Sequence, residues 1–322
     1  MTTTSWLNPL AALVLAPLLP GIINRTKAFF AGRQGQPLLQ GYYDLAKLLQ
    51  KGAVYSRTTS WIFRAGPVVG LAAVLVALVL LPLGGAAAPL NFTGDLILLA
   101  YLLGLMRFFT VIAALDTGSA FEGMGASREV QFSVLAEPAL LLSLAALGRA
   151  GQIGSGSRIE HLSNFLSLSW TYSNLSALAW MRNGTILLLV AGALLIVLLA
   201  ENSRIPVDDP NTHLELTMIH EVMVLDHGGP DLAMILYGAA LKLWVFCALL
   251  AGVLIPVRSS YWWLNAGAVI GGIFILGVVI GVIESSMARL RLLRVPQLLT
   301  GAGVLSILAF ALVLWRQYGT LD

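Results

Sequence analysis

Long uninterrupted apolar runs alternate with short polar segments along most of this chain. A helix needs about 20 apolar residues to cross roughly 30 Å of hydrocarbon. Eight runs approach that length: about 5–23, 67–88, 96–115, 130–148, 184–200, 232–255, 262–283 and 298–315. Because these runs are continuous and do not alternate between polar and apolar positions, they predict helices and not a barrel. We therefore expect an all-α integral membrane protein, a single membrane domain over residues 1–322 with about eight transmembrane helices.

Composition supports a membrane protein. Of the 322 residues 58% are hydrophobic and only 11% are charged, and the mean hydropathy is +0.84. A soluble domain of this size could not cover its surface with so few charges. The net charge of +3 arises from basic residues in short loops, which predicts no nucleic-acid partner. The start MTTTSWLNPL lacks a basic segment and a cleavage site, so we expect the first apolar run to be retained.

The basic residues fall unevenly on the two sides of the expected membrane. One side carries twelve: Arg25, Lys27, Arg33, Lys47, Lys51, Arg57, Arg64, Arg128, Arg204, Arg289, Arg291 and Arg294. The other side carries five: Arg149, Arg158, Arg182, Arg258 and Arg316. The positive-inside rule places the first set in the cytoplasm and both termini outside.

The first cytoplasmic loop contains a candidate amphipathic helix, PLLQGYYDLAKLLQK. Its apolar positions recur at helical spacing: Leu38, Leu39, Tyr42, Leu45, Ala46 and Leu49. Polar residues such as Asp44 and Lys47 occupy the opposite face. This pattern predicts a helix that lies along the membrane surface or against a partner; the alternative is a solvated loop with a chance stripe.

The longest polar interruption that still has the pattern of ordered structure is residues 201–231, called the central segment below. It holds seven of the sixteen acids and three of the four histidines. Asp209-Pro210 is a helix-start signal and Gly228-Gly229 a stop signal, so we expect a helix over about 210–226. We interpret it as an interfacial helix whose acids and histidines meet a partner or protons; a solvated polar face is the alternative.

The chain offers no metal or cofactor site of its own. His220-Glu221 begins an H-E-x-x-H pattern, but Val224 occupies the second histidine position. On a helix His213 and His220 would be about 10.5 Å apart along the axis, too far to bind one zinc ion. The single cysteine, Cys247, can form neither an internal disulfide nor an iron–sulfur site, so any redox metal belongs to a partner.

Several charged residues fall within or at the ends of the apolar runs: Arg107, Glu137, Glu201, Lys242 and Glu284. A charge that faces lipid costs at least about 2.5–3.5 kcal/mol, so these side chains should face the bundle interior or water. They predict either a proton or ion path or an internal ion pair that fixes helix packing, such as Arg107 or Lys242 with Glu137. We favour the path for Glu137 and Glu201.

Three segments carry a resemblance to a known family. The frame Pro206-Val207-Asp208-Asp209-Pro210, with a later Glu215-Leu216, is similar to the signature loop of the membrane subunit that anchors the peripheral arm in respiratory complex I and in membrane-bound nickel–iron hydrogenases. Residues 36–49 resemble a second motif of that subunit, and residues 128–137 resemble its arginine-bearing entry to a glutamate-containing span. The segment ENSRIPVDDPNTHLELTMIHE resembles the subunit of formate hydrogenlyase and related hydrogenases.

The resemblance implies a non-catalytic subunit in the inner membrane of a bacterium or archaeon. Its expected partners are the hydrogenase large and small subunits, an iron–sulfur protein, an antiporter-like membrane subunit and lipid; the nickel–iron site and iron–sulfur clusters lie in those partners. For proton coupling we select Arg107, Glu137, Glu201, Asp208, Asp209, Glu215, Glu221 and Lys242. For partner docking we select Arg25, Lys47, Arg204, His213 and His220.

Three alternatives stay open. The first is the quinone-site subunit of a complex I-type NADH dehydrogenase. Against it, Asn211, His213 and Met218 stand where complex I members have acids that line the quinone chamber. The second is a stand-alone ion transporter, although many of those have internal repeats and none is evident here. The third is a purely structural anchor.

Overall fold

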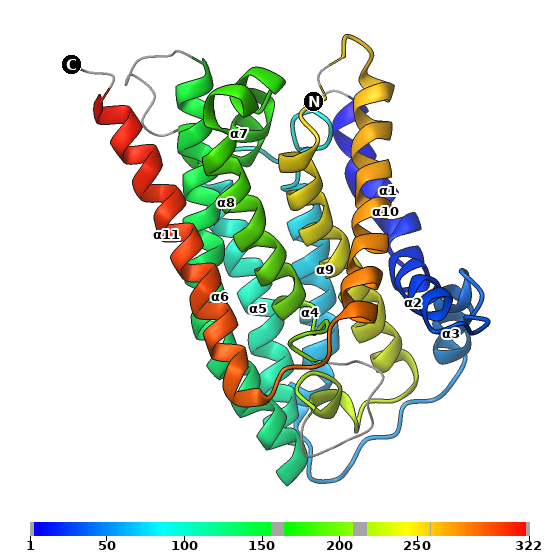
Figure 1. Cartoon of the computed structure of the whole chain (residues 1–322). Coiled ribbons are helices and arrows are strands. Elements are labelled where there is room, and N and C mark those ends of the chain that lie inside the picture. The colour runs from blue at the N-terminus through cyan, green and yellow to red at the C-terminus, as the bar shows by residue number, and fades with distance from the viewer. Residues whose placement is uncertain (1–2, 156–163, 209–217, 258, 320–322) are drawn as a thin grey trace.

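The computed structural model describes residues 3–155, 164–208, 218–257 and 259–319, and within them every regular element is helical (Figure 1). This confirms the predicted all-α membrane class. The elements are η1 (Thr3–Trp6), α1 (Leu7–Leu15), α2 (Leu18–Phe30), α3 (Gln40–Leu49), α4 (Trp61–Val79), α5 (Asp95–Asp116), α6 (Ala120–Ser155), η3 (Asn164–Leu166), α7 (Leu168–Asn174), α8 (Ala177–Glu201), η4 (Glu221–Val224), α9 (Gly229–Leu254), α10 (Trp262–Ser286), η5 (Leu292–Arg294) and α11 (Val295–Gly319).

Seven helices of the described residues are long and apolar enough to cross a membrane: α4, α5, α6, α8, α9, α10 and α11. The helices at the start of the chain, α1 with η1 and then α2, pass the same test only as a pair. They are bent by 52° at the break between them, which makes them either a broken eighth span or a re-entrant loop. The bend differs from the single run expected over 5–23. Pro17 lies at the break, and because proline has no N–H it cannot continue the hydrogen-bond ladder there.

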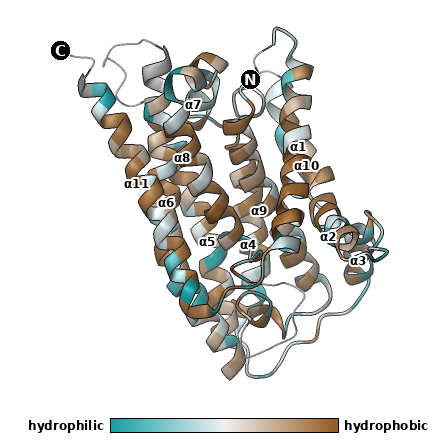
Figure 2. Ribbon diagram, viewed as in Figure 1, coloured by the Kyte–Doolittle hydropathy of each residue, from teal (hydrophilic) through white to brown (hydrophobic). Residues whose placement is uncertain are grey.

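The helices are apolar along most of their lengths, as Figure 2 shows. The α6, α8 and α11 helices pack on one another, α4 packs against α5 and α9, and α10 packs against α2. Every residue of α9 from 240 to 253 is buried, so this helix is enclosed by protein through its middle. A helix that is hydrophobic all round is expected to be buried in this way. Lys242, in the buried part of α9, is therefore surrounded by protein and not by lipid.

The two ends of the bundle differ. The beginning of the chain and the end of α11 lie at one end, called the terminal end below, and the described residues of the central segment, 201–208 and 218–231, lie at the other, called the loop end (Figure 1). At the terminal end the buried carboxylate of Asp95 accepts hydrogen bonds from Leu168 N (2.7 Å) and the Ser167 hydroxyl (3.2 Å). Tyr172 donates to Leu249 O at 2.8 Å. The first two bonds hold the start of α7 against α5, and the third joins α7 to α9 at Leu249.

The amphipathic helix of the first loop is α3, within residues 36–50 where the sequence predicts it. None of its residues is buried, and Leu38, Leu39, Tyr43 and Leu49 are exposed large hydrophobic residues at or beside it. An apolar face on a surface helix of a membrane protein fits contact with lipid or with a partner.

The prediction of a helix over 210–226 is wrong for residues 218–226, the part of it that the structure describes. Residues 209–217 lie outside the described residues, and within 218–228 the only helix is the four-residue 3₁₀ turn η4. Side-chain carboxylates take backbone donors that an α-helix would use internally. Asp208 accepts from Ile219 N (3.0 Å) and His220 N (3.3 Å), and Glu122 accepts from Asp226 N (3.2 Å).

Candidate functional site: a buried ion cluster

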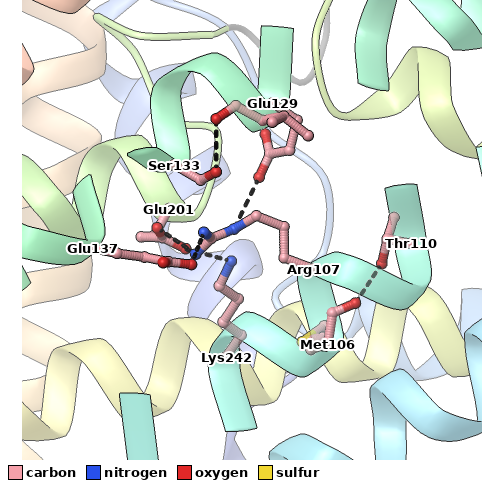
Figure 3. Close-up of polar contacts among 9 residues, drawn as sticks. Met106, Arg107, Thr110, Glu129, Ser133, Glu137, Glu201 and Lys242 are labelled. Carbon is pink, nitrogen blue, oxygen red and sulfur yellow. Dashed lines mark hydrogen bonds and ion pairs between the residues drawn. The ribbon is translucent and has the colours of Figure 1, made fainter. Parts of the chain in front are cut away.

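Arg107 of α5 lies at the centre of a cluster of buried charges (Figure 3). Its Nη1 lies 2.5 Å from Glu137 Oε1, and its Nη2 lies 2.6 and 2.8 Å from the two oxygens of Glu201. Its Nε lies 3.5 Å from Glu129 Oε1. One guanidinium therefore contacts three carboxylates, two from α6 and one from the end of α8, because its donors point in several fixed directions.

Lys242 of α9 completes the cluster, with its Nζ 2.9 Å from Glu201 Oε2. Glu201 is thus shared by two cations. Burying an ion costs several kcal/mol, and pairing of this kind offsets that cost. The cluster contains three acids and two bases, so with every group ionised it has one excess negative charge. Addition of one proton would make the cluster neutral.

Glu137 connects this cluster to the protein surface. Its side chain is 49% exposed, whereas those of Arg107, Glu129, Glu201 and Lys242 are 10% exposed or less. It lines a cleft of about 550 Å³ along α5 and α6, whose other walls are mostly apolar and include Tyr101 and Phe108. A half-exposed carboxylate within a membrane-spanning helix requires water or a partner against it.

A second set of ion pairs lies nearer the loop end. Glu284 of α10 pairs with Lys27 at 2.9 Å and with Arg204 at 3.5 Å. Asp208 is 2% exposed, and its Oδ1 lies 2.7 Å from Arg289 Nη2. Arg204 and Asp208 of the central segment are thus paired with the end of α10 and with Arg289, which follows it, and Lys27 joins α2 to the same end of α10.

The structure separates the residues selected for docking into two groups. Arg25 and Lys47 are exposed. By contrast, Arg204 has a side chain only 12% exposed and is paired with Glu284, and His220 has a buried Nδ1. His213, together with the coupling candidates Asp209 and Glu215, lies outside the described residues, while Glu221 begins η4 and is half-buried.

His220 lies in the central segment, outside the membrane-spanning helices. Its burial lowers the pKa of the imidazole to about 4, and the nearby positive charges of Lys242 and Arg107 act in the same direction. Asp208 and Glu201 oppose them. The ring is therefore neutral at pH 7, with one nitrogen as donor and the other as acceptor.

Glu129 is the member of the cluster that the sequence did not single out. It precedes the apolar run expected at 130–148, but α6 begins ten residues earlier, at Ala120. The spacing of polar residues could have identified it. Glu129, Ser133 and Glu137 recur every four residues and so lie along one face of a helix. Among the described residues no group of three or more His, Cys, Asp or Glu side chains is placed to hold a metal ion.

Comparisons with known proteins agree with this architecture. The model of the NADH dehydrogenase family matches residues 5–316. Formate hydrogenlyase subunit 4 of Escherichia coli (strain K12) is 31% identical over 315 residues, covering 96% of this chain and 97% of that protein. Hydrogenase-4 component C of the same organism is 33% identical over 309 residues, covering 94% and 92%.

Among solved structures, a chain of the membrane-bound sulfane sulfur reductase (MBS), an archaeal respiratory membrane complex, has a TM-score of 0.78. It is 19% identical in sequence, and the match covers 96% of this chain and 98% of that one, which shows a shared fold. The resemblance noted in the sequence is thereby confirmed: this multi-pass membrane chain belongs to the NADH dehydrogenase family.

Proposed function

We propose that this chain is the membrane subunit of a multisubunit hydrogenase of the formate hydrogenlyase kind, and that it couples the redox chemistry of a docked arm to proton movement. The names of the two Escherichia coli relatives support the hydrogenase assignment. The nickel–iron site and iron–sulfur clusters then lie in partner subunits, and the membrane is the inner membrane of a bacterium or archaeon with both termini outside.

The observation that carries the coupling role is the buried cluster around Arg107. The members that are 10% exposed or less balance in charge, two acids against two bases, so the excess negative charge of the cluster lies on half-exposed Glu137. Here three acids share two bases, and one acid, Glu137, reaches a cleft at the surface. The arrangement supports a group of acids that takes up a proton and passes it sideways, toward an antiporter-like membrane subunit beside α5 and α6.

Docking of the arm is proposed for the loop end. The exposed cations Arg25 and Lys47 are assigned to docking of the hydrogenase large and small subunits and an iron–sulfur protein. His213 is assigned to the same role from the sequence alone, since it lies outside the described residues. Asp208 supports this role indirectly, since it holds the backbone of Ile219 and His220 in place.

The match to the NADH dehydrogenase family model favours a second candidate, a quinone-site subunit of a complex I-type enzyme. The two proposals differ in what co-purifies. Purification of the tagged chain in mild detergent should yield hydrogenase subunits and no stoichiometric quinone. Bound quinone together with NADH-oxidising partners would favour the second candidate.

The substitution Glu137→Gln tests coupling directly. It keeps the shape and much of the hydrogen bonding but removes the exchangeable proton. We expect normal assembly and normal hydrogenase activity with an artificial electron donor, but fewer protons translocated per turnover in vesicles.

Glu122→Gln is the matched control, because Glu122 is a buried acid of the same helix that binds Asp226 N and not Arg107. An assembled Glu137→Gln complex that moves as many protons per turnover as wild type would make Glu137 a packing residue and count against the coupling role.

A further inference from the structure

The cleft beside Glu137 is long and follows the direction of the helices that form it. Its α5 side extends from Leu98 to Val111, and its α6 side includes Val130, Ser133 and Glu137. At 1.5 Å per residue the α5 side is about 20 Å long, roughly two-thirds of the hydrocarbon thickness of a bilayer. The cleft therefore has the length and direction of a groove that another membrane-spanning helix could occupy.

The walls of the cleft are mostly apolar and face outward. Tyr101, Leu105, Phe108 and Val130 all line it and are exposed. Inside a membrane such side chains fit lipid chains and the apolar face of a second helix about equally well, because lipid is as apolar as leucine. The apolar walls alone do not distinguish the two occupants.

The carboxylate in the cleft does distinguish them. Glu137 lies about midway between Ala120 and Gly151, the ends of the span that α6 provides, and its side chain is half-exposed. At that depth a bilayer offers only hydrocarbon chains, and a carboxylate that faces them is strongly disfavoured. Water alone would have to fill a space with mostly apolar walls. Both arguments favour protein as the occupant of the cleft.

The charge balance of the cluster indicates the chemistry of that protein. Glu137 receives one contact from Arg107, through Nη1, while the other donors of the guanidinium face Glu129 and Glu201. Lys242 contacts Glu201 and not Glu137. The excess negative charge therefore lies at the cleft, where a cation on the neighbouring protein would balance it.

A second, smaller cavity places the cleft next to the interior of the cluster. Its volume is about 120 Å³, and its lining includes Tyr101, Gly104, Arg107 and Glu137, which also line the cleft, together with Glu201. A Cβ atom at Gly104 would lie 3.5 Å from Glu137 Oε1, so the glycine leaves that oxygen uncovered on the α5 side. A group that reaches Glu137 from outside is thus also close to the buried charges.

We propose that the cleft between α5 and α6 is the docking site for a transmembrane helix of a neighbouring membrane subunit, and that this helix carries a lysine or arginine that pairs with Glu137. The apolar face of the helix packs on the walls, and its base supplies the missing positive charge. The inference rests on the proposed function, since it requires a multisubunit membrane complex. It deepens that function by placing a charged group of the neighbour against the cluster.

Photo-crosslinking in the complete membrane complex identifies the occupant. A benzophenone amino acid is placed at Phe108 in the cleft and, as a control, at Ile307, which is exposed midway along α11. Mass spectrometry of the digested complex then identifies what each position captures. We expect position 108, and not position 307, to capture an apolar segment of another membrane subunit that contains a lysine or arginine. Capture of lipid alone at 108, or of a segment without such a base, overturns the inference.

A matched pair of tryptophan substitutions tests whether the cleft is a packed contact. Leu105 and Leu308 are both exposed near the middle of their helices, α5 and α11, so neither substitution replaces a buried side chain. We expect Leu105→Trp to lower the amount of the captured subunit retained per copy of this chain at least about fivefold, because overfilling a packed contact weakens it by about that factor or more. Leu308→Trp should retain it as wild type does. Equal retention in the two variants overturns the inference.

A double-mutant cycle tests the ion pair itself. Replacing the captured base of the neighbour by methionine leaves Glu137 unmatched and should reduce retention of that subunit. The same replacement in a Glu137→Gln background should have little further effect, because no unmatched carboxylate remains. Glu137→Gln alone should still assemble, since its amide oxygen can accept a hydrogen bond from the base. Additive losses would show that the two residues are not paired and overturn that part of the inference.

The proton measurement on Glu137→Gln separates this inference from the coupling function. If position 108 captures the expected segment and Leu105→Trp loses the neighbour while Glu137→Gln moves as many protons per turnover as wild type, docking stands and coupling falls. If Glu137→Gln reduces proton movement while position 108 captures only lipid, coupling stands and docking falls.

Discussion

Lys242 and Glu201 join the buried middle of α9 to the last residue of α8, with 2.9 Å between Nζ and Oε2. Because Arg107 binds the same carboxylate, Glu201 is the only acid of the cluster that contacts both cations among the described residues. Substitution of Glu201 should therefore remove an ion-pair partner from both α5 and α9.

A double-mutant cycle tests the energetic link between these two residues. Lys242→Met leaves three acids with one base and should destabilise the complex by about 3–5 kcal/mol, as removal of one partner of a buried pair does. Adding Glu201→Gln returns the cluster to the single excess negative charge of the wild type, so the double variant should be less destabilised than the sum of the single variants. Thermal unfolding of the purified complex measures this, and additive losses would show that the pair is not coupled.

The membrane orientation is tested with reporter fusions. The asymmetry of twelve basic residues against five predicts a cytoplasmic reporter after residue 60 and after residue 215, and an external one after residue 165. The even number of crossings, counting the bent α1–α2 pair as one, agrees with both termini on one side. A cytoplasmic signal at 165 would contradict this assignment.

Docking is tested with photo-crosslinking residues introduced at Lys47 and at position 213. Lys47 is exposed on α3, so a crosslinker there should capture soluble subunits of the hydrogenase arm if the loop end is the docking surface. Leu178 is a suitable control position, since it is 63% exposed near the start of α8, toward the terminal end. Capture of lipid alone at Lys47, with the arm still bound, would exclude docking at α3.

The lowered pKa of His220 predicts a dependence of stability on pH. The unfolded chain binds a proton at this residue below about pH 6.5, whereas the folded chain binds it only below about 4. Stability should therefore fall as pH decreases from 6.5 to 4, by at most roughly 3 kcal/mol. Thermal unfolding at several pH values should show a weaker dependence in His220→Gln, and an unchanged dependence would mean that the ring titrates normally.

The sequence predicted much of the architecture because burial in lipid leaves a strong pattern. Continuous apolar runs of about 20 residues have few structural solutions, so the class and the approximate number of spans followed from them. The bend at Pro17 was missed because a length count ignores which residues can donate hydrogen bonds. The helix over 210–226 was predicted from capping residues alone. In its described half, the carboxylates of Asp208 and Glu122 accept hydrogen bonds from backbone N–H groups, and the chain does not form the predicted α-helix there.

The site was predicted in part. Charges inside apolar runs identified Arg107, Glu137 and Lys242, and the structure contains the Arg107–Glu137 pair that was considered for them. Sharing of one carboxylate by two cations depends on how three helices are oriented, which periodicity within each helix does not determine. Glu129 was assigned to a loop for the simpler reason that an apolar run marks the lipid-facing length of a helix and not the helix end.

The terminal half of α9 bears on the direction of the proposed proton transfer. No acidic or basic residue of α9 follows Lys242, and Tyr172 and Trp180 occupy backbone carbonyls near its far end, at Leu249 and Val253. On the coupling proposed above, a proton that reaches the cluster has no charged residue of α9 beyond Lys242 to accept it, whereas Glu137 opens to a cleft at the side. The proposed function therefore implies that this chain passes protons sideways to a neighbouring subunit and that the neighbour carries them across the membrane.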